Sequence, residues 1–308
     1  MNNTLLVEVL AAGVAYGTPL LYAALGEVLT ERSGVLNLGV EGMMLVGALA
    51  GFAATARTGS PWIGALAAAA VGGGLSVIHA LLSVTLRANQ VASGLALTIF
   101  GTGLSAFLGR GYVGVPAAGF HALSVPLLAT VPVLGPILFQ QDPLIYLSYL
   151  AVPAAWYVLY RTRWGLDLRA VGEHPEAADA MGVDVARVRY TCVVTGGLLA
   201  GLGGAFLSTA YTSMWIENMT AGRGWIAVAL VIFATWDPLR AVFGAYLFGG
   251  VNALQLHIQA TGSSLPTYLL LMAPYVFTIV VLVIATQETA RKRWGAPAAL
   301  TIPYRRPG

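Results

Sequence analysis

The stretch RTRWGLDLRAVGEHPEAADAMGVDVARVR, residues 161–189, decides how this chain folds, because it is the polar part of an otherwise apolar protein. It holds ten charged side chains, although the whole chain has only 29 (16 basic plus 13 acidic). Apolar segments long enough to cross a bilayer flank it on both sides. A structured polar loop between membrane-crossing segments is the part of the chain best placed to bind a soluble partner.

The composition indicates that most of this protein is embedded in lipid. Its 308 residues are 57% hydrophobic and 9% charged, and the mean hydropathy is +0.77. Soluble domains carry roughly 25% charged residues. The net charge of +3 is small and the basic residues lie at the ends of apolar segments, so we expect no nucleic-acid partner. The single cysteine, Cys192, excludes an intrachain disulfide and a cysteine metal cluster.

Nine apolar segments are candidate membrane spans, since a crossing helix needs roughly 20 mostly apolar residues. They are residues 8–30, 35–55, 61–86, 91–109, 143–160, 190–212, 224–236, 238–259 and 266–286. The seventh is too short to cross, and it could form a broken or re-entrant element with the eighth. We therefore predict an all-α, polytopic bundle of about nine (roughly eight to ten) membrane helices, with residues 1–308 forming a single integral membrane domain.

The basic residues predict the orientation of the bundle. If 161–189 is cytoplasmic, only Arg57, Arg110 and Arg223 of the 16 Lys and Arg residues face outside. That distribution satisfies the positive-inside rule, and the inverted arrangement violates it. We expect a multi-pass protein of the cell (inner) membrane with its N-terminus outside and its C-terminus in the cytoplasm. The segment 110–142 then becomes an external excursion.

Within the polar loop, the residues around Pro175 predict a short helix. Proline suits the first helical position, Glu176 lies in the electropositive first turn, and Gly182 suits a C-terminal stop. Helical spacing places three small or apolar side chains on one face: Ala177, Ala180 and Met181. So short a helix is not stable alone in water. It either docks into a groove of a partner or is a solvated connector, and these residues alone leave both readings open.

Three polar side chains fall in or beside the first two spans, namely Glu27, Asn37 and Glu41. Carboxylates in lipid usually face the bundle interior or an aqueous path. We predict that Asn37 and Glu41 lie one turn apart on one helix face and line a substrate route, with hydrogen bonding between helices as the alternative. For Glu27 we expect hydrogen bonding between helices. His79, in the third span, is expected to do the same rather than bind a ligand.

Motifs of the common enzyme classes are missing from the sequence. It contains no Walker loop, no HExxH, no GxSxG and no aspartate-rich metal motif. We therefore predict no catalytic residue, no metal site and no cofactor bound by this chain. If ATP drives its activity, another chain must bind the ATP and its magnesium. A proton-coupled secondary transporter using Glu27, Glu41 and His79 is a rival interpretation.

Two N-terminal stretches, TPLLYAALGE (18–27) and ERSGVLNLGVEGMM (31–44), resemble the signature of ABC importer permeases of the nucleoside, simple-sugar-like branch. Residues 168–182 resemble the coupling segment of that family. Shorter blocks at 196–205, 221–227 and 273–275 also fit. The resemblance runs in order over nearly the whole chain, and it extends more distantly to branched-chain amino acid and ribose permeases.

The resemblance implies a permease subunit of an ATP-driven importer for nucleosides, with a monosaccharide or a branched-chain amino acid as alternative substrates. It implies three protein partners: a second permease subunit, a cytoplasmic ATP-binding subunit, and an extracellular lipoprotein that delivers the small molecule. The short helix would dock into the ATP-binding subunit and drive alternating access. The coupling residues would then be Glu173, Pro175, Glu176, Ala177, Asp179, Ala180, Met181 and Gly182.

Overall fold

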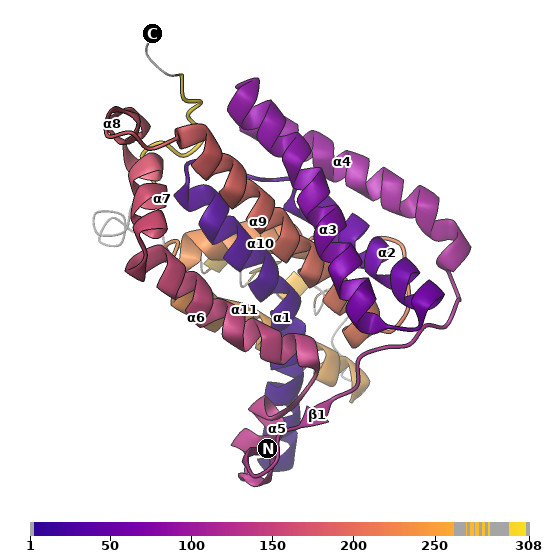
Figure 1. Cartoon of the computed structure of the whole chain (residues 1–308). Coiled ribbons are helices and arrows are strands. Elements are labelled where there is room, and N and C mark those ends of the chain that lie inside the picture. Colours follow the sequence, from indigo (N-terminus) through magenta and orange to yellow (C-terminus); the bar gives the residue numbers. More distant parts are fainter. Residues whose placement is uncertain are drawn as a thin grey trace.

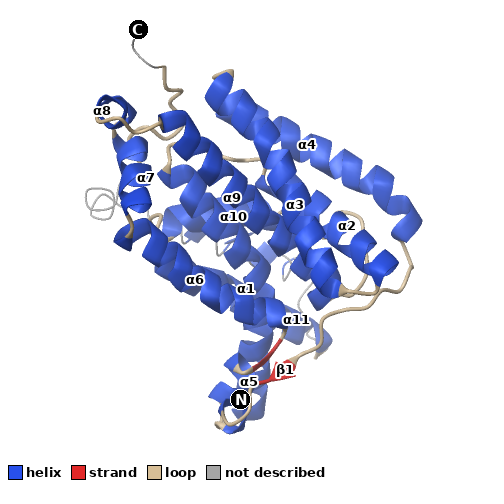
Figure 2. Cartoon of the chain, in the orientation of Figure 1, coloured by secondary structure: helices blue, strands red, loops and turns tan. Residues whose placement is uncertain are grey.

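The computed structural model describes residues 3–261 and 296–305, together with residues 269, 272, 273, 275, 276, 279, 280 and 283. Helices dominate this part of the chain (Figure 2), which confirms the all-α prediction. The strands found in it are β1 (Leu123–Ser124) and β2 (Gln140–Gln141), which pair antiparallel. Among the described residues, seven helical segments are long and apolar enough to cross a membrane. The chain is therefore a multi-pass membrane protein.

The seven long segments match seven of the nine predicted spans. They are α1 (Asn3–Arg32), α2 (Val40–Thr58), α3 (Pro61–Ala80) continued by η1 (Leu81–Thr85), α4 (Gln90–Gly109) continued by η2 (Arg110–Tyr112), α6 (Pro143–Arg161), α9 (Val185–Ala205) continued by η4 (Phe206–Tyr211), and α11 (Pro238–Ala260). The short seventh prediction corresponds to α10 (Arg223–Phe233). The ninth, 266–286, lies outside the described residues apart from isolated positions.

The elements between the spans gather at two opposite ends of the bundle. One end carries α7 (Arg163–Glu173), α8 (Pro175–Ala180) and the segment 296–305 (Figure 1). The other end carries the start of α1, with β1 and α5 (Leu134–Leu138) beside it. With η3 (Leu128–Thr130), these last elements make up the excursion predicted at 110–142. The polar loop and the start of the chain therefore lie on opposite sides.

The centre of the bundle is α9, which packs against α1, α2 and α3. Glycines allow the closest of these approaches. A methyl group on Gly72 of α3 would collide with the carbonyl oxygen of Gly197 and lie 2.9 Å from Cα of Gly201, both in α9. Because packing rather than hydrophobicity drives helix association in lipid, these contacts determine how α3 and α9 sit together.

Buried polar side chains form hydrogen bonds across the bundle. The ring nitrogens of His79 lie 3.0 Å from Ser93 Oγ and 3.0 Å from the carbonyl oxygen of Leu36, which confirms the bonding predicted for this histidine. The indole Nε1 of Trp236 donates to Glu31 Oε2 at 2.6 Å. Since an unpaired polar group in lipid is costly, these bonds fix the α1–α2 link against α3, and the end of α1 against the turn that follows α10.

Gly72→Ala is expected to destabilise the bundle, because its methyl group overlaps the backbone of α9. Overpacking of this kind costs about 1–3 kcal/mol. The control is Gly74→Ala in the same helix, where a methyl group meets nothing within 4 Å. Thermal unfolding of the detergent-solubilised protein should show a lower melting temperature for Gly72→Ala only. Equal melting temperatures for the two variants would contradict this account of the α3–α9 contact.

Candidate coupling surface and substrate path

The short helix α8 stands at the surface with its small apolar face uncovered. Ala177, Ala180 and Met181 are all exposed, and Met181 is 85% exposed. On the opposite side, Ala178 is 4% exposed and packs into the main hydrophobic core. The structure thus brings the three residues predicted to share a face together on the outside of the protein. Glu176 is exposed beside them.

The other predicted coupling residues begin, end or support this helix. Pro175 occupies its first turn, and Gly182, with a φ of +87°, follows its end in the left-handed conformation that glycine adopts readily. Glu173 ends α7, and its Oε2 accepts a hydrogen bond from the backbone N–H of Ala298 at 3.3 Å. Asp179 is half-buried and accepts a hydrogen bond from another part of the chain.

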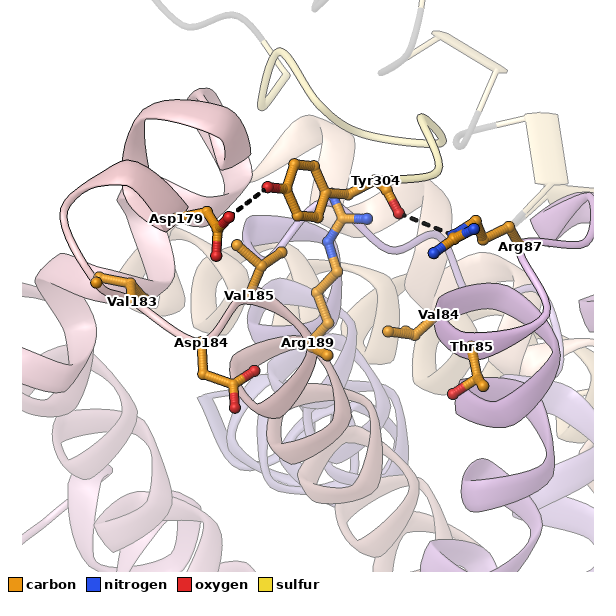
Figure 3. Close-up of a pocket in the computed structure, with 11 residues that line it drawn as sticks. Val84, Thr85, Arg87, Asp179, Val183, Asp184, Val185, Arg189 and Tyr304 are labelled. Atoms are coloured by element: carbon orange, nitrogen blue, oxygen red, sulfur yellow. Dashed lines mark hydrogen bonds between the residues drawn. The ribbon is translucent and has the colours of Figure 1, made fainter. Parts of the chain in front are cut away.

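That partner belongs to the segment 296–305, here called the C-terminal brace, which the sequence analysis missed. The hydroxyl of Tyr304 donates to Asp179 Oδ2 at 2.9 Å, and the Tyr304 carbonyl accepts from Arg87 Nε at 3.1 Å (Figure 3). The backbone N–H of Ala299 donates to the carbonyl oxygen of Gly172 at 2.9 Å. The brace therefore connects α7 and α8 to the link between η1 and α4.

A cavity of about 440 Å³ lies between the brace, α8, α9 and η1. Arg189 of α9 lines it and is 1% exposed (Figure 3). Its Nε donates to the carbonyl oxygen of Ser33 and its Nη1 to that of Ile302, both at 3.2 Å. Arg189 thus joins the brace to the residue that follows α1. The position of α8 is therefore stabilised by the brace, which Arg189 connects to the end of α1.

At the other candidate site, Glu41 in the first turn of α2 is 3% exposed. Its Oε1 accepts from Thr220 Oγ1 at 2.5 Å and from the N–H of Gly222 at 2.8 Å, and its Oε2 accepts from the N–H of Gly224 at 2.6 Å. These donors lie at the N-terminus of α10, where backbone N–H groups lack intrahelical partners and the helix dipole is positive. The carboxylate of Glu41 therefore caps α10.

The helix that Glu41 caps spans only part of a membrane. At about 1.5 Å per residue its 11 residues extend about 16 Å, roughly half of a hydrocarbon core about 30 Å thick. Beyond its C-terminal end, Trp236 bonds to Glu31 near the end of α1. The N-terminus of α10 consequently lies inside the bundle, at the depth of Glu41. Many transporters place their substrate sites beside such half-helices.

Asn37 lies in the link between α1 and α2, so the prediction that it shares a helix face with Glu41 is wrong. Residues 35–39 are not helical, and α2 begins only at Val40. Asn37 is fully buried, and its Nδ2 donates to Glu27 Oε1 at 3.1 Å. Glu27 therefore bonds to the α1–α2 link, whereas the prediction was a bond to another helix. This bond ties the link to α1.

The sequence matches the protein family described as "Branched-chain amino acid transport system / permease component" over residues 9–286. The chain is 46% identical to the putative glucose ABC transporter permease protein TsgC13 of Haloferax volcanii, an alignment that covers 96% of this chain and 97% of TsgC13. It is 35% identical to the guanosine ABC transporter permease protein NupQ of Bacillus subtilis, with 96% of both chains covered.

It is also 37% identical to the nucleoside ABC transporter permease protein NupC of Lactococcus lactis, over 91% of this chain and 92% of NupC. Haloferax volcanii and Bacillus subtilis each have a second, more distant permease relative, TsgB13 at 27% and NupP at 26% identity. The family match and the full-length similarities agree with the bundle of membrane helices. The chain belongs to this family of ABC transporter permeases and is a membrane-spanning transport subunit rather than an enzyme.

Proposed function

We propose that this permease imports nucleosides, with residues 1–308 acting as one membrane domain that forms half of the translocation path. Two relatives, NupQ and NupC, are named for guanosine and nucleoside transport. The observation that best supports an ATP-driven mechanism is the exposed face of α8, formed by Ala177, Ala180 and Met181. A small, exposed apolar face on a helix that the rest of the protein holds in place is suited to docking into a groove of another protein.

The partner for α8 is a cytoplasmic ATP-binding subunit that holds the ATP and magnesium, while this chain binds no cofactor. The acidic residues Glu173 and Glu176 border the apolar face and would contact the rim of the groove. The bonds of Asp179 and Arg189 to the C-terminal brace support the helix under load. Closure of the ATP-binding subunits would then move α8 and the bundle together, which is alternating access by rigid-body motion.

Two further partners complete the transporter. A second, different permease subunit would form the other half of the path, and the pairs NupQ with NupP and TsgC13 with TsgB13 support it. An extracellular lipoprotein would bind the small molecule and deliver it. Lipid surrounds the bundle, and no nucleic acid takes part.

The orientation that fits these partners has α8 in the cytoplasm of a cell (inner) membrane protein. The C-terminal brace, bonded to α8, is then also cytoplasmic, and the start of α1, at the opposite end of the bundle (Figure 1), is outside. The basic residues support this arrangement through the positive-inside rule. Inside the bundle, Glu41 and Asn37 would border the solute route by fixing the start of α10 and the α1–α2 link.

A monosaccharide is the alternative solute, because TsgC13 is named for glucose and is 46% identical. Uptake by the complete transporter separates the two possibilities. Radiolabelled guanosine should accumulate in cells that express the transporter, and excess glucose should not compete. Uptake of glucose without uptake of guanosine would favour the alternative.

The double variant Ala177→Arg with Ala180→Arg is expected to abolish uptake, because two long cations cannot enter a groove shaped for two methyl groups. The variant should still reach the membrane, since both side chains are exposed. ATP hydrolysis should no longer respond to solute. The control is Ala186→Arg, which adds one arginine at an exposed alanine outside α8. Normal uptake by the double variant would refute the docking role.

The orientation can be tested with two single-cysteine proteins in a Cys192→Ala background. Leu127 in the 110–142 segment and Met181 after α8 are matched, because each is 85% exposed. A membrane-impermeant maleimide added to intact cells should label Leu127→Cys and leave Met181→Cys unlabelled. Inside-out vesicles should show the reverse. Labelling of Met181→Cys in intact cells would place α8 outside and contradict the proposed orientation.

A further inference from the structure

A cavity of about 210 Å³ opens beside the first turn of α10, between α1, α10 and α11. Its polar wall is formed by four side chains: Tyr16, Arg223, Asn252 and Gln255. Tyr16 lies near the middle of α1, and Arg223 is the first residue of α10. The cavity therefore lies at the depth of the half-helix N-terminus rather than at either end of the bundle.

A second hollow of about 490 Å³ adjoins the first and shares three lining residues with it: Ala221, Ile226 and Tyr275. The two together form one cavity with two lobes. The second lobe is lined mainly by apolar and aromatic groups, among them Trp225, Ala229 and Ile279. Trp225 and Tyr275 are each 49% exposed, so their ring faces are accessible to a bound molecule.

The polar lobe contains hydrogen-bonding groups that the described part of the chain leaves unused. Gln255 is 6% exposed, yet its Nε2 has no partner there. Asn252 donates through Nδ2 to the carbonyl oxygen of Phe248 at 3.0 Å, which leaves its amide oxygen available as an acceptor. Buried polar groups normally have partners. An unpaired amide facing a cavity therefore indicates a ligand that supplies the missing acceptor.

The polar lobe is lined by the cation Arg223, and the carboxylate of Glu41 bonds to the next residue, Gly224, so the two opposite charges together favour an uncharged ligand. The carboxylate of Glu41 already accepts hydrogen bonds from the N–H groups of Gly222 and Gly224, so the positive start of α10 is not available to an anion. Arg223 uses its Nη1 for the carbonyl oxygens of Met219 and Thr220, at 3.1 Å each. The backbone N–H groups of Gly222 and Gly224 are therefore not free to bind a phosphate group in this cavity.

We infer that this two-lobed cavity contacts the transported solute, and that the solute is an uncharged molecule with a flat aromatic ring and a hydroxyl-rich part. The ring would stack on Trp225 or Tyr275, as bases stack on aromatic side chains in other proteins. The hydroxyl groups would bond to Gln255 and Asn252. This chemistry is that of a nucleoside, and the inference rests on the proposed function. A monosaccharide would fill the polar lobe and leave the aromatic one empty.

The test measures uptake of radiolabelled guanosine by the complete transporter, with the binding protein in excess. Trp225→Leu removes the ring and Gln255→Met removes the amide, so each is expected to lower uptake by about fivefold or more. Trp225→Phe keeps a ring and should retain most of the uptake. The matched control is Gln259→Met, one turn further along α11. The Nε2 of Gln259 also lacks a partner among the described residues, but Gln259 does not line the cavity.

Assembly of the complex and its basal ATP hydrolysis are measured on the same samples and should match the wild type for every variant. Wild-type uptake by Trp225→Leu and Gln255→Met would overturn the site while the proposed function survives. If Trp225→Leu and Trp225→Phe lose uptake equally and both assemble poorly, Trp225 has a packing role. That result would also overturn the proposed binding site. If the wild type imports glucose and not guanosine, the proposed function fails, and the stacking lobe fails with it.

Discussion

One buried carboxylate makes it possible for a helix to begin inside the membrane. Away from water, the first N–H groups of α10 would have no partner, and each unpaired group is costly in lipid. Glu41 of α2 accepts hydrogen bonds from the N–H groups of Gly222 and Gly224, and the hydroxyl of Thr220 donates to the same carboxylate. Gly224 permits the approach, since a Cβ there would lie 2.6 Å from the Glu41 backbone. The cavity beside α10 lies at the depth where this helix begins.

The same half-helix connects the cavity to the end of the protein that carries α8. Beyond the end of α10, the carbonyl oxygen of Trp236 accepts from Arg32 Nε at 3.2 Å. The next residue, Ser33, accepts from Arg189, which also bonds to the C-terminal brace. The brace in turn bonds to Asp179 of α8. These hydrogen bonds, with the short stretches of chain between them, connect α8 to the end of α10.

The sequence predicted the features that depend on local patterns. Hydropathy located seven of the spans and identified the seventh candidate, α10, as too short to cross, and Pro175 with Gly182 located α8. Contacts between distant residues leave no such pattern. Glu41 and Gly224 are 183 residues apart, and Tyr304 and Asp179 are 125 apart. The helix-face prediction for Asn37 failed because Gly34, with a φ of +89°, precedes a link with no helical turn.

The most direct measurement for this account is guanosine uptake by the Glu41→Gln variant in complexes that assemble at the wild-type level. An amide keeps one acceptor oxygen but turns an NH₂ group toward an N–H of α10, so one hydrogen bond to a charged group is lost. Such a bond is worth about 1.5–3 kcal/mol, and we predict that uptake falls about tenfold or more. Thr220→Val, which removes only the hydroxyl donor, should have a smaller effect. Wild-type uptake by Glu41→Gln would contradict the account.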